Sequence, residues 1–294
     1  MKQFKFAPSG AFLAIGGIIL FSSKAVFVKL AYQHDVSTLH LLLFRLLFAA
    51  PVYMTILLYK RNSIVVSKND YFPIIMLGFV GYYLASYFDF EGLNYIKARL
   101  ERIILFLYPT LVLLISKFFI KKEISKTQWL AIGITYIGVL ITFWSELKVS
   151  GDHIVFGGVL IFLSALTYAV YLVGSGNLIP RIGVIGFTSY AMIVSTICIL
   201  FHYLISDRGN IYAYDSEVYF YGLVMAIFCT IIPSFLVSAA IKQLGASTFA
   251  IFGSLGPVCT IALANILLEE SLTLIQVIGC CIVIAGVYVI GKKK

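Results

Sequence analysis

The stretch from Gly78 to Glu123 reads GFVGYYLASYFDFEGLNYIKARLERIILFLYPTLVLLISKFFIKKE. Two apolar runs flank a short polar break, and the second run contains a proline. The same arrangement recurs 148 residues later in the chain. The residues that match at this offset are Ser86 and Ser234, Ala98 and Ala246, Pro109 and Pro257, Gln128 and Gln276, and Gly138 and Gly286. A chance similarity would not keep one offset over so long a span, so the sequence predicts two copies of one unit.

The composition of the whole chain indicates a membrane protein. Of its 294 residues, 61% are hydrophobic and 12% are charged, and the mean hydropathy is +1.00. An ordinary soluble domain is about 45–50% apolar and about 25% charged. Apolar runs near 20 residues recur along the chain, and each could cross a hydrocarbon core of about 30 Å at about 1.5 Å per residue. The predicted fold class is therefore all-α, a polytopic helical membrane protein.

We predict about ten transmembrane helices. Their approximate ranges are 8–31, 38–59, 71–90, 98–119, 126–144, 154–176, 184–205, 217–240, 246–268 and 272–291. The junctions near Lys97 and Gly245 are so short that each neighbouring pair can also be interpreted as one long, broken helix. Lys2 and Lys5 precede the first apolar run as in a signal peptide, but that run is too long and lacks a small-residue cleavage site, so we interpret it as the first span.

The positive charges of the chain indicate orientation. The formal net charge is +9, but most of the lysines and arginines lie at the ends of the predicted spans rather than on one basic face, so we expect no nucleic acid partner. With both termini in the cytoplasm, about 14 of them fall on the cytoplasmic side and about 6 on the outer side. The sequence thus predicts cytoplasmic termini and a lipid bilayer as the surroundings of the chain.

The sequence offers little for metal or cofactor chemistry. The four histidines lie near span ends without metal-ligand spacing, and the five cysteines lie inside apolar segments. We expect structural or packing roles for both residue types and no metal site. Neither HExxH nor GxSxG nor the phosphate-binding GxxxxGK[ST] pattern occurs, so we expect no enzyme activity, no cofactor and no ATP-driven pumping.

The repeat divides the chain into residues 1–147 and 148–294. Each copy carries five predicted helices, an odd number, so the second copy must enter the membrane in the opposite sense from the first. Inverted repeats are typical of secondary transporters, which place a substrate site near the midplane between the halves. The loop 146–153 is the predicted hinge, and the other connections are too short to hold a soluble domain.

Five segments resemble the EamA type of the drug/metabolite transporter superfamily, and together they reach across nearly the whole chain. They are FSSKAVFVKLAY (21–32), FRLLFAAPVY (44–53), YLASYFDFEGLNYIKA (83–98), LERIILFLYPTLVLLISKFFIKKE (100–123) and ASTFAIFGSLGPVCTIALANILLEES (246–271). In both copies an alanine precedes a proline by eleven residues, an acidic residue follows the span, and the next span contains glycine. The resemblance implies a ten-helix carrier of small metabolites in a bacterial-type inner membrane, with amino-acid and related exporters prominent in the family.

Five of the charged residues within the predicted spans are candidates for a function, namely Lys24, Arg45, Asp89, Glu101 and Arg102. A charge in hydrocarbon costs at least about 2.5–3.5 kcal/mol, so it is rarely kept without a partner, a cavity or a function. All five belong to the outer half of the membrane. The residues at the repeat offset are the uncharged Leu172, Ile193, Val237, Phe249 and Ala250. If these charges only supported a fold that is the same in both copies, we would expect them in both copies.

These charges predict an outer gate or vestibule in which Asp89 and Glu101 pair with Lys24, Arg45 or Arg102. The formal sum of the five charges is +1, which would accept a substrate carboxylate. The alternative interpretation is that the three shallower residues, Asp89, Glu101 and Arg102, extend to the outer headgroups. Asp89 or Glu101 could also carry a coupling proton, and facilitated diffusion stays open.

Helical spacing places hydroxyl and aromatic side chains on one face of three further spans. The faces are Tyr82, Ser86 and Asp89; Ser164, Tyr168, Tyr171 and Ser175; and Thr230, Ser234 and Ser238. If these faces point to the midplane, they form a pocket for a small amphipathic solute, to which we add Tyr108. Serine and threonine also join membrane helices without binding anything, which is the alternative for each of them.

Two prolines and two glycines are candidates for helix bending. Pro109 and Pro257 each remove a helical hydrogen bond inside a span, and Gly253 and Gly256 loosen the second copy further. They could permit movement during transport, although proline kinks also occur in static membrane helices.

The function predicted from the sequence is a secondary transporter that exports small polar or amphipathic metabolites, such as amino acids, by alternating access. The alternative is a channel or a non-transporting membrane partner protein. A channel should carry rings of charge or carbonyl groups around one pore, whereas the charges here are confined to one copy. A partner protein would need neither the repeat nor a buried lysine.

Overall fold

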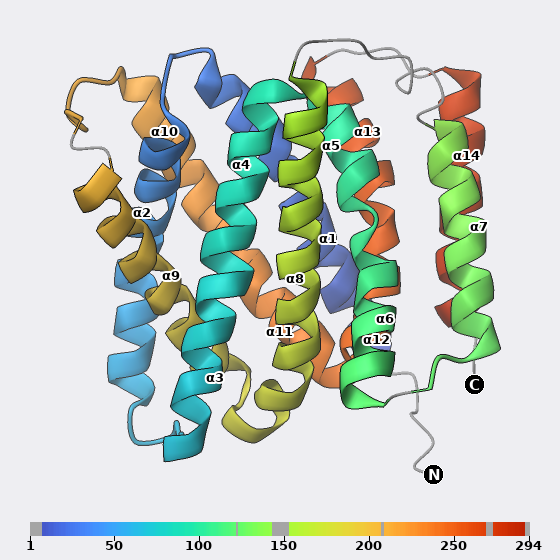
Figure 1. Cartoon of the computed structure of the whole chain (residues 1–294), viewed down its shortest axis with the longest axis horizontal. Helices are drawn as coiled ribbons and strands as arrows, with labels where there is room; N and C mark the ends of the chain where they lie inside the picture. Colours follow the sequence, from blue (N-terminus) through green and yellow to red (C-terminus); the bar gives the residue numbers. More distant parts are fainter. Residues whose placement is uncertain (1–7, 122, 143–152, 207–208, 269–272, 292–294) are drawn as a thin grey trace.

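The computed structural model describes residues 8–121, 123–142, 153–206, 209–268 and 273–291, and the regular structure in these ranges is helical throughout (Figure 1). The helices of the first half are α1 (Pro8–Tyr32), α2 (Thr38–Lys60), α3 (Lys68–Gly78), α4 (Ala85–Tyr95), α5 (Ala98–Leu105), α6 (Tyr108–Ile120) and α7 (Lys126–Thr142). Those of the second half are α8 (Ile154–Ile182), α9 (Val184–Ser206), α10 (Ser216–Ala226), α11 (Ile232–Leu244), α12 (Ala246–Phe252), α13 (Gly256–Leu268) and α14 (Leu274–Gly291). The predicted all-helical fold class is confirmed.

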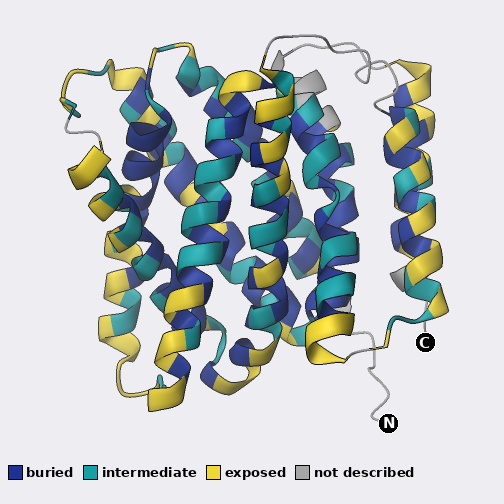
Figure 2. Cartoon of the chain, in the orientation of Figure 1, coloured by how far each residue is buried: buried dark blue, intermediate teal, exposed yellow. Residues whose placement is uncertain are grey.

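Length and composition make this a membrane fold. Within the described ranges, seven helical stretches are long and apolar enough to cross a bilayer. They are Ser9–Tyr32, Thr38–Lys60, Lys68–Tyr95, Leu100–Ile120, Ile154–Ile182, Val184–Ser206 and Ser216–Leu244. Large apolar side chains such as Phe12, Phe119 and Val155 are exposed on the outside of the bundle, as lipid contact requires. Figure 2 shows the buried residues on the helix faces that point towards the centre.

The two short junctions separate helices that run in opposite directions (Figure 1). Between α4 and α5, Ile96 and Lys97 adopt extended backbone conformations, with φ −127° and ψ 159° at Ile96. Between α11 and α12, Gly245 has φ 78° and ψ 156°, a conformation that residues with a Cβ rarely adopt. The interpretation as one long, broken helix is therefore wrong at both junctions.

A π-helical segment interrupts one long helix in each half. Phe79–Leu84 lies between α3 and α4, and Ile227–Ile231 lies between α10 and α11. The two segments begin 148 residues apart, which is the offset of the sequence repeat. Single π-helical turns inside α-helices often occur at functional sites because they redirect the side chains that follow.

The predicted helix-bending residues lie at a second pair of interruptions. Pro109 occupies the first turn of α6, directly after the break at Phe106 and Leu107 that separates α5 from α6. Pro257 occupies the first turn of α13, which follows the 3₁₀ turn Gly253–Leu255. A proline at these positions starts a helix segment without losing a helical hydrogen bond. Both prolines thus begin a helix beyond an existing break.

Helices α7 and α14 pack chiefly against each other at one edge of the molecule (Figure 1). Glycines bring the two backbones together: a Cβ at Gly138 would lie 2.7 Å from the Val283 nitrogen, and one at Gly279 would lie 2.7 Å from the Gly138 oxygen. The other helices enclose the main core, whose largest fully buried side chains are Tyr53, Tyr171, Phe90, Phe187 and Phe249.

Candidate functional site

A cavity of about 110 Å³ lies among helices from both halves of the chain. Ten of the predicted site residues line it, namely Lys24, Arg45, Tyr82, Ser86, Arg102, Tyr108, Tyr168, Thr230, Gly253 and Gly256. Six do not, namely Asp89, Glu101, Tyr171, Ser234, Pro109 and Pro257. The structure therefore brings most of the predicted residues to one place, although they come from ten separate helices and helical turns.

The cavity follows the repeat of the sequence. Four pairs of its lining residues are related by the offset of 148. The pairs are Gly81 and Cys229, Tyr82 and Thr230, Leu105 and Gly253, and Tyr108 and Gly256. The first two pairs come from the π-helical segments, and the others from the breaks that precede Pro109 and Pro257. Both types of helix interruption thus shape the wall of the cavity.

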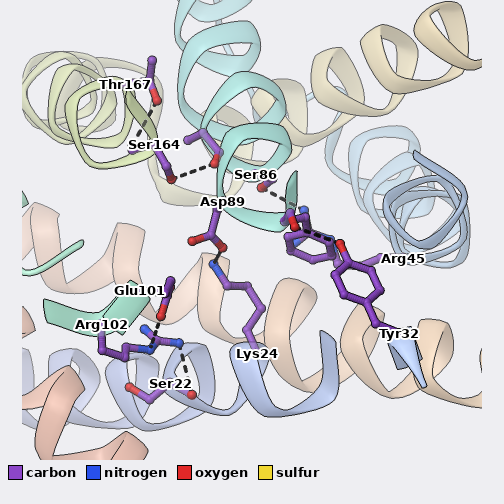
Figure 3. A network of polar contacts seen from close by, with 12 residues as sticks. Ser22, Lys24, Tyr32, Arg45, Ser86, Asp89, Glu101, Arg102, Ser164 and Thr167 are labelled. Carbon is purple, nitrogen blue, oxygen red and sulfur yellow. Dashed lines mark hydrogen bonds and ion pairs between the residues drawn. The ribbon is translucent and has the colours of Figure 1, made fainter. Parts of the chain in front are cut away.

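Lys24 and Asp89 form an ion pair between α1 and α4 (Figure 3). The Asp89 side chain is almost completely buried, and Lys24 is only slightly more exposed. Lys24 lines the cavity, whereas Asp89 lies behind it. A lysine of α1 and an aspartate of α4 thus neutralise each other inside the bundle, as the sequence predicted for this carboxylate.

Glu101 and Arg102 are neighbours on α5 and form a second pair, with 3.1 Å between Arg102 Nε and Glu101 Oε2 (Figure 3). Arg102 also donates from Nη2 to the main-chain oxygen of Ser22, at 3.2 Å. Together with the Lys24–Asp89 pair, these contacts make a polar network across α1, α4 and α5 (Figure 3). Glu101 and Arg102 are buried, and the interpretation that they and Asp89 extend to the headgroups is wrong.

Arg45 is held differently from the other two cations. Its side chain is only 3% exposed, and Nη2 donates to the Ser86 hydroxyl at 2.9 Å. The guanidinium lies over the Phe90 ring, 4.9 Å from its centroid. Among the ion pairs of the described residues, none joins Arg45 to a carboxylate, and its Nε has no hydrogen-bond acceptor there.

Four tyrosines form a continuous aromatic wall beside the charges. Tyr171 donates to the Tyr82 hydroxyl at 2.9 Å, and the two ring centroids are 4.8 Å apart. Tyr168 links Tyr171 to Tyr108, with centroid distances of 5.9 Å and 5.5 Å. Tyr171 packs so closely against Gly81 that a Cβ there would lie 2.2 Å from the ring. Gly81 lies in the π-helical segment Phe79–Leu84, and the absence of a Cβ there leaves space for this ring.

The remaining predicted hydroxyl groups mostly join helices. Ser234 bonds to the Tyr53 hydroxyl at 2.8 Å, and Ser238 accepts from Thr188 at 2.7 Å. Thr230 lines the cavity, but its hydroxyl donates to the main-chain oxygen of Met225 five residues earlier. The packing interpretation therefore fits Ser234 and Ser238, whereas Thr230 lies at the cavity wall.

Several residues of the site were not predicted. Phe90 lies beneath both Lys24 and Arg45, and the Cys229 sulfur is 3.3 Å from the Ser23 hydroxyl. Gly81 and Cys229 could have been found by applying the repeat offset to the neighbours of Tyr82 and Thr230. Phe90 carried no such signal, because a phenylalanine in an apolar helix has no distinguishing pattern.

The sequence also did not predict a small cluster near the end of α1. The ligand atoms of His34, Asp215 and Glu217 lie within 4.8 Å of one another, with both acidic residues exposed. His34 is far from Asp215 and Glu217 in the chain, so spacing could not reveal that the three residues lie together. Exposed acidic groups of this kind are common without a metal ion, and we assign the cluster no role.

The comparisons with known proteins agree on one family. The model of the EamA-like transporter family matches residues 8–144 and again residues 155–292. The chain is 32% identical over 282 residues to the uncharacterized transporter YcbK of Bacillus subtilis (strain 168), covering 93% of this chain and 90% of that protein. It is 24% identical over 278 residues to an uncharacterized transporter of Archaeoglobus fulgidus, covering 94% and 95% of the two chains.

Among solved structures, one crystal structure has a TM-score of 0.79 over 96% of both chains, with 16% identity, which shows a shared fold. The two matches to the family model together span most of the sequence. The chain belongs to the EamA-like transporter family, and it is accordingly an integral membrane transporter and not an enzyme.

Proposed function

We propose that the chain is a secondary carrier of small polar or amphipathic metabolites, such as amino acids, which works by alternating access in a bacterial-type inner membrane. Export is the expected direction, as the family resemblance implies. The observation that carries this proposal is the cavity whose wall contains equivalent residues of both halves. A site at the centre of a repeat can be exposed to either side when one half moves against the other.

The proposed architecture is ten spans arranged as two inverted units, residues 1–147 and 148–294. In this arrangement α3 and α4, α5 and α6, α10 and α11, and α12 and α13 each make one span. The shared offset of the π-helical segments supports the repeat, as does the separate match of each half to the family model. The boundary between the two proposed units, after residue 147, and the loop 146–152 lie outside the described residues.

The polar network is the proposed outer gate. The Lys24–Asp89 ion pair joins α1 to α4, and the hydrogen bond from Arg102 to the Ser22 oxygen joins α5 to α1. The charged residues of this network have no charged counterparts in the second half. Separating such buried charges is costly, so the network favours one arrangement of the three helices until a solute or a proton replaces a contact. Asp89 and Glu101 are the candidates for a coupling proton because both are buried carboxyl groups within this network.

We propose that both termini lie in the cytoplasm. The charge bias of the connecting segments supports this orientation, with Lys60, Arg61 and Lys68 on one such segment. Lys2, Lys5, Lys122 and the tail Lys292–Lys294, which also contributed to the prediction, lie outside the described residues.

The test is solute counterflow in liposomes that contain the purified protein. The panel comprises amino acids, organic acids, nucleosides and amines, each measured with and without a pH gradient. A carrier should give saturable exchange that is specific for one class, and a coupled carrier should respond to the gradient. Flux that does not saturate would favour the channel, and a complete lack of flux and of thermal stabilisation would favour the partner protein. Empty liposomes are the control.

A further inference from the structure

The charged residues that line the cavity are all cations. Lys24, Arg45 and Arg102 reach its wall, whereas Asp89 and Glu101 do not. Lys24 and Arg102 are each neutralised by one of these carboxylates from behind. The side of the cavity that a solute meets therefore carries positive charge and, among the described residues, no acidic group.

Arg45 is the cation that this arrangement leaves without a counterion. Burial of a guanidinium is unfavourable unless an anion or a set of acceptors replaces its hydration. The Ser86 hydroxyl and the Phe90 ring supply one acceptor and one aromatic face. Nε still lacks an acceptor among the described residues, although the side chain is 97% buried at the cavity wall.

The geometry of a guanidinium selects the kind of anion that fits. Its planar fork of N–H donors matches the two oxygens of a carboxylate. The rest of the wall is mainly apolar and aromatic, with Ile18, Phe21, Leu105, Met192 and Phe249 beside the tyrosines. The cavity of about 110 Å³ is smaller than the engineered cavity of about 150 Å³ that encloses benzene. A compact carboxylate with a short apolar body meets these conditions.

We propose that the transported solute is a small organic monoanion and that Arg45 binds its carboxylate. This inference rests on the proposed carrier function and narrows its substrate class. An amine or the ammonium group of an amino acid would need an unpaired acid at the wall, but both nearby carboxylates already pair with cations. The cavity thus favours a carboxylic acid over the amino acid that has the same side chain.

The experiment compares four compounds that share one three-carbon skeleton: propanoate, propanamide, alanine and propylamine. Thermal stabilisation of the purified protein reports binding, and counterflow in liposomes reports transport. We expect propanoate to bind at least about tenfold more tightly than the amide, because a hydrogen bond to a charged group is stronger than one between neutral groups. Alanine and the amine should bind more weakly than propanoate.

The variant Arg45→Gln should lose the preference for the carboxylate over the amide while it still binds the amide. That retained binding separates loss of the anion site from loss of folding. Arg45→Lys keeps the positive charge but loses the planar set of N–H donors, so its preference for the carboxylate over the amide should be intermediate. The matched control is Arg61→Gln, which removes an exposed arginine just beyond the other end of the same helix and should keep the full preference.

Two outcomes would overturn the inference and leave the carrier function intact. One is saturable flux in the unmodified protein with no preference for the carboxylate over the amide. The other is an unchanged preference in Arg45→Gln. If none of the four compounds, and no member of the wider panel, gives saturable counterflow, the carrier function and the anion site are both wrong.

Discussion

The charged residues of the first half show why a membrane interior keeps a charge. Each of Lys24, Asp89, Glu101 and Arg102 has an oppositely charged neighbour, and Arg45 has a hydroxyl and an aromatic face. Breaking one buried pair leaves an uncompensated charge and typically costs about 3–5 kcal/mol, whereas replacing both partners by apolar groups is often neutral. Comparing the replacement of one partner with the replacement of both therefore distinguishes an ion pair that only stabilises the fold from one that transport requires.

The residue-scale prediction uses the repeat to choose the substitutions. Lys24→Leu introduces the residue found at the equivalent position 172, and we expect it to lower the melting temperature and to impair transport because Asp89 loses its partner. Adding Asp89→Val, the residue at position 237, should restore the melting temperature without restoring transport. Melting curves in detergent and counterflow in liposomes measure the two effects.

The amount of protein inserted into membranes is the control for this pair of variants, and it should not change. Normal flux in Lys24→Leu would show that the gate hypothesis is wrong. Full recovery of flux in the double variant would assign the pair a purely structural role.

At the scale of helices, the interruptions matter more than the prolines beside them. Gly253 lies in the 3₁₀ turn between α12 and α13, and a Cβ there would lie only 1.3 Å from the Tyr108 hydroxyl. Gly256 starts α13, and a Cβ there would meet the Ser22 hydroxyl at 3.7 Å, an ordinary contact. The two glycines were predicted to share a bending role, but close approach of a tyrosine concerns Gly253 alone.

We therefore predict different stabilities for alanine at these two positions. Gly253→Ala should destabilise the protein by about 1–3 kcal/mol because the Tyr108 ring must move within a packed wall. Gly256→Ala should be neutral or stabilising by up to about 1 kcal/mol, since alanine favours a helix. Melting temperatures of the two purified variants test this contrast, and equal losses would contradict it.

A second helix-scale prediction concerns α7 and α14. Gly279→Ala would place a Cβ 2.1 Å from the Thr142 hydroxyl and 2.7 Å from the Gly138 oxygen, so the two helices must separate and the melting temperature should fall. Gly133→Ala on α7 meets nothing within 4 Å and is the matched control. Neither helix contributes a described residue to the cavity wall, so ligand affinity measured on folded protein should be similar in both variants.

At the scale of the whole molecule, the proposed inversion makes a geometric prediction. Asn62 and Asn210 are related by the repeat offset, and both are exposed in connecting segments. Equivalent positions of an inverted repeat lie on opposite sides of the membrane, whereas those of a parallel repeat lie on the same side. With both termini in the cytoplasm, Asn62 should face the cytoplasm and Asn210 the outside.

Single cysteines at these two positions test the arrangement in a background where the five native cysteines are replaced. A thiol reagent that cannot cross the membrane should label Asn210→Cys in intact cells, and Asn62→Cys only after the cells are opened. Labelling of both from the same side would contradict the inverted repeat, and the reverse pattern would contradict the orientation of the termini.

Hydropathy and the repeat were enough to predict the helical membrane fold and most helix boundaries. The predicted ranges 38–59, 126–144 and 184–205, for example, nearly coincide with α2, α7 and α9. Insertion of an apolar segment and formation of its helical hydrogen bonds depend on that segment alone, so they can be predicted from local sequence. The unusual cost of charges in a span likewise identified Lys24, Arg45 and Asp89 as residues of interest.

Only the tertiary structure decided how these residues are used. It pairs Lys24 with Asp89, leaves Arg45 with Ser86, and places Glu101 behind the cavity rather than in its wall. It also brings Tyr171 onto Gly81 through a π-helical turn that hydropathy does not predict. Such contacts depend on how helices distant in sequence are rotated and displaced against one another. Hydropathy along a single helix contains little information about that rotation, because the lipid-facing and protein-facing sides of a membrane helix are both largely apolar.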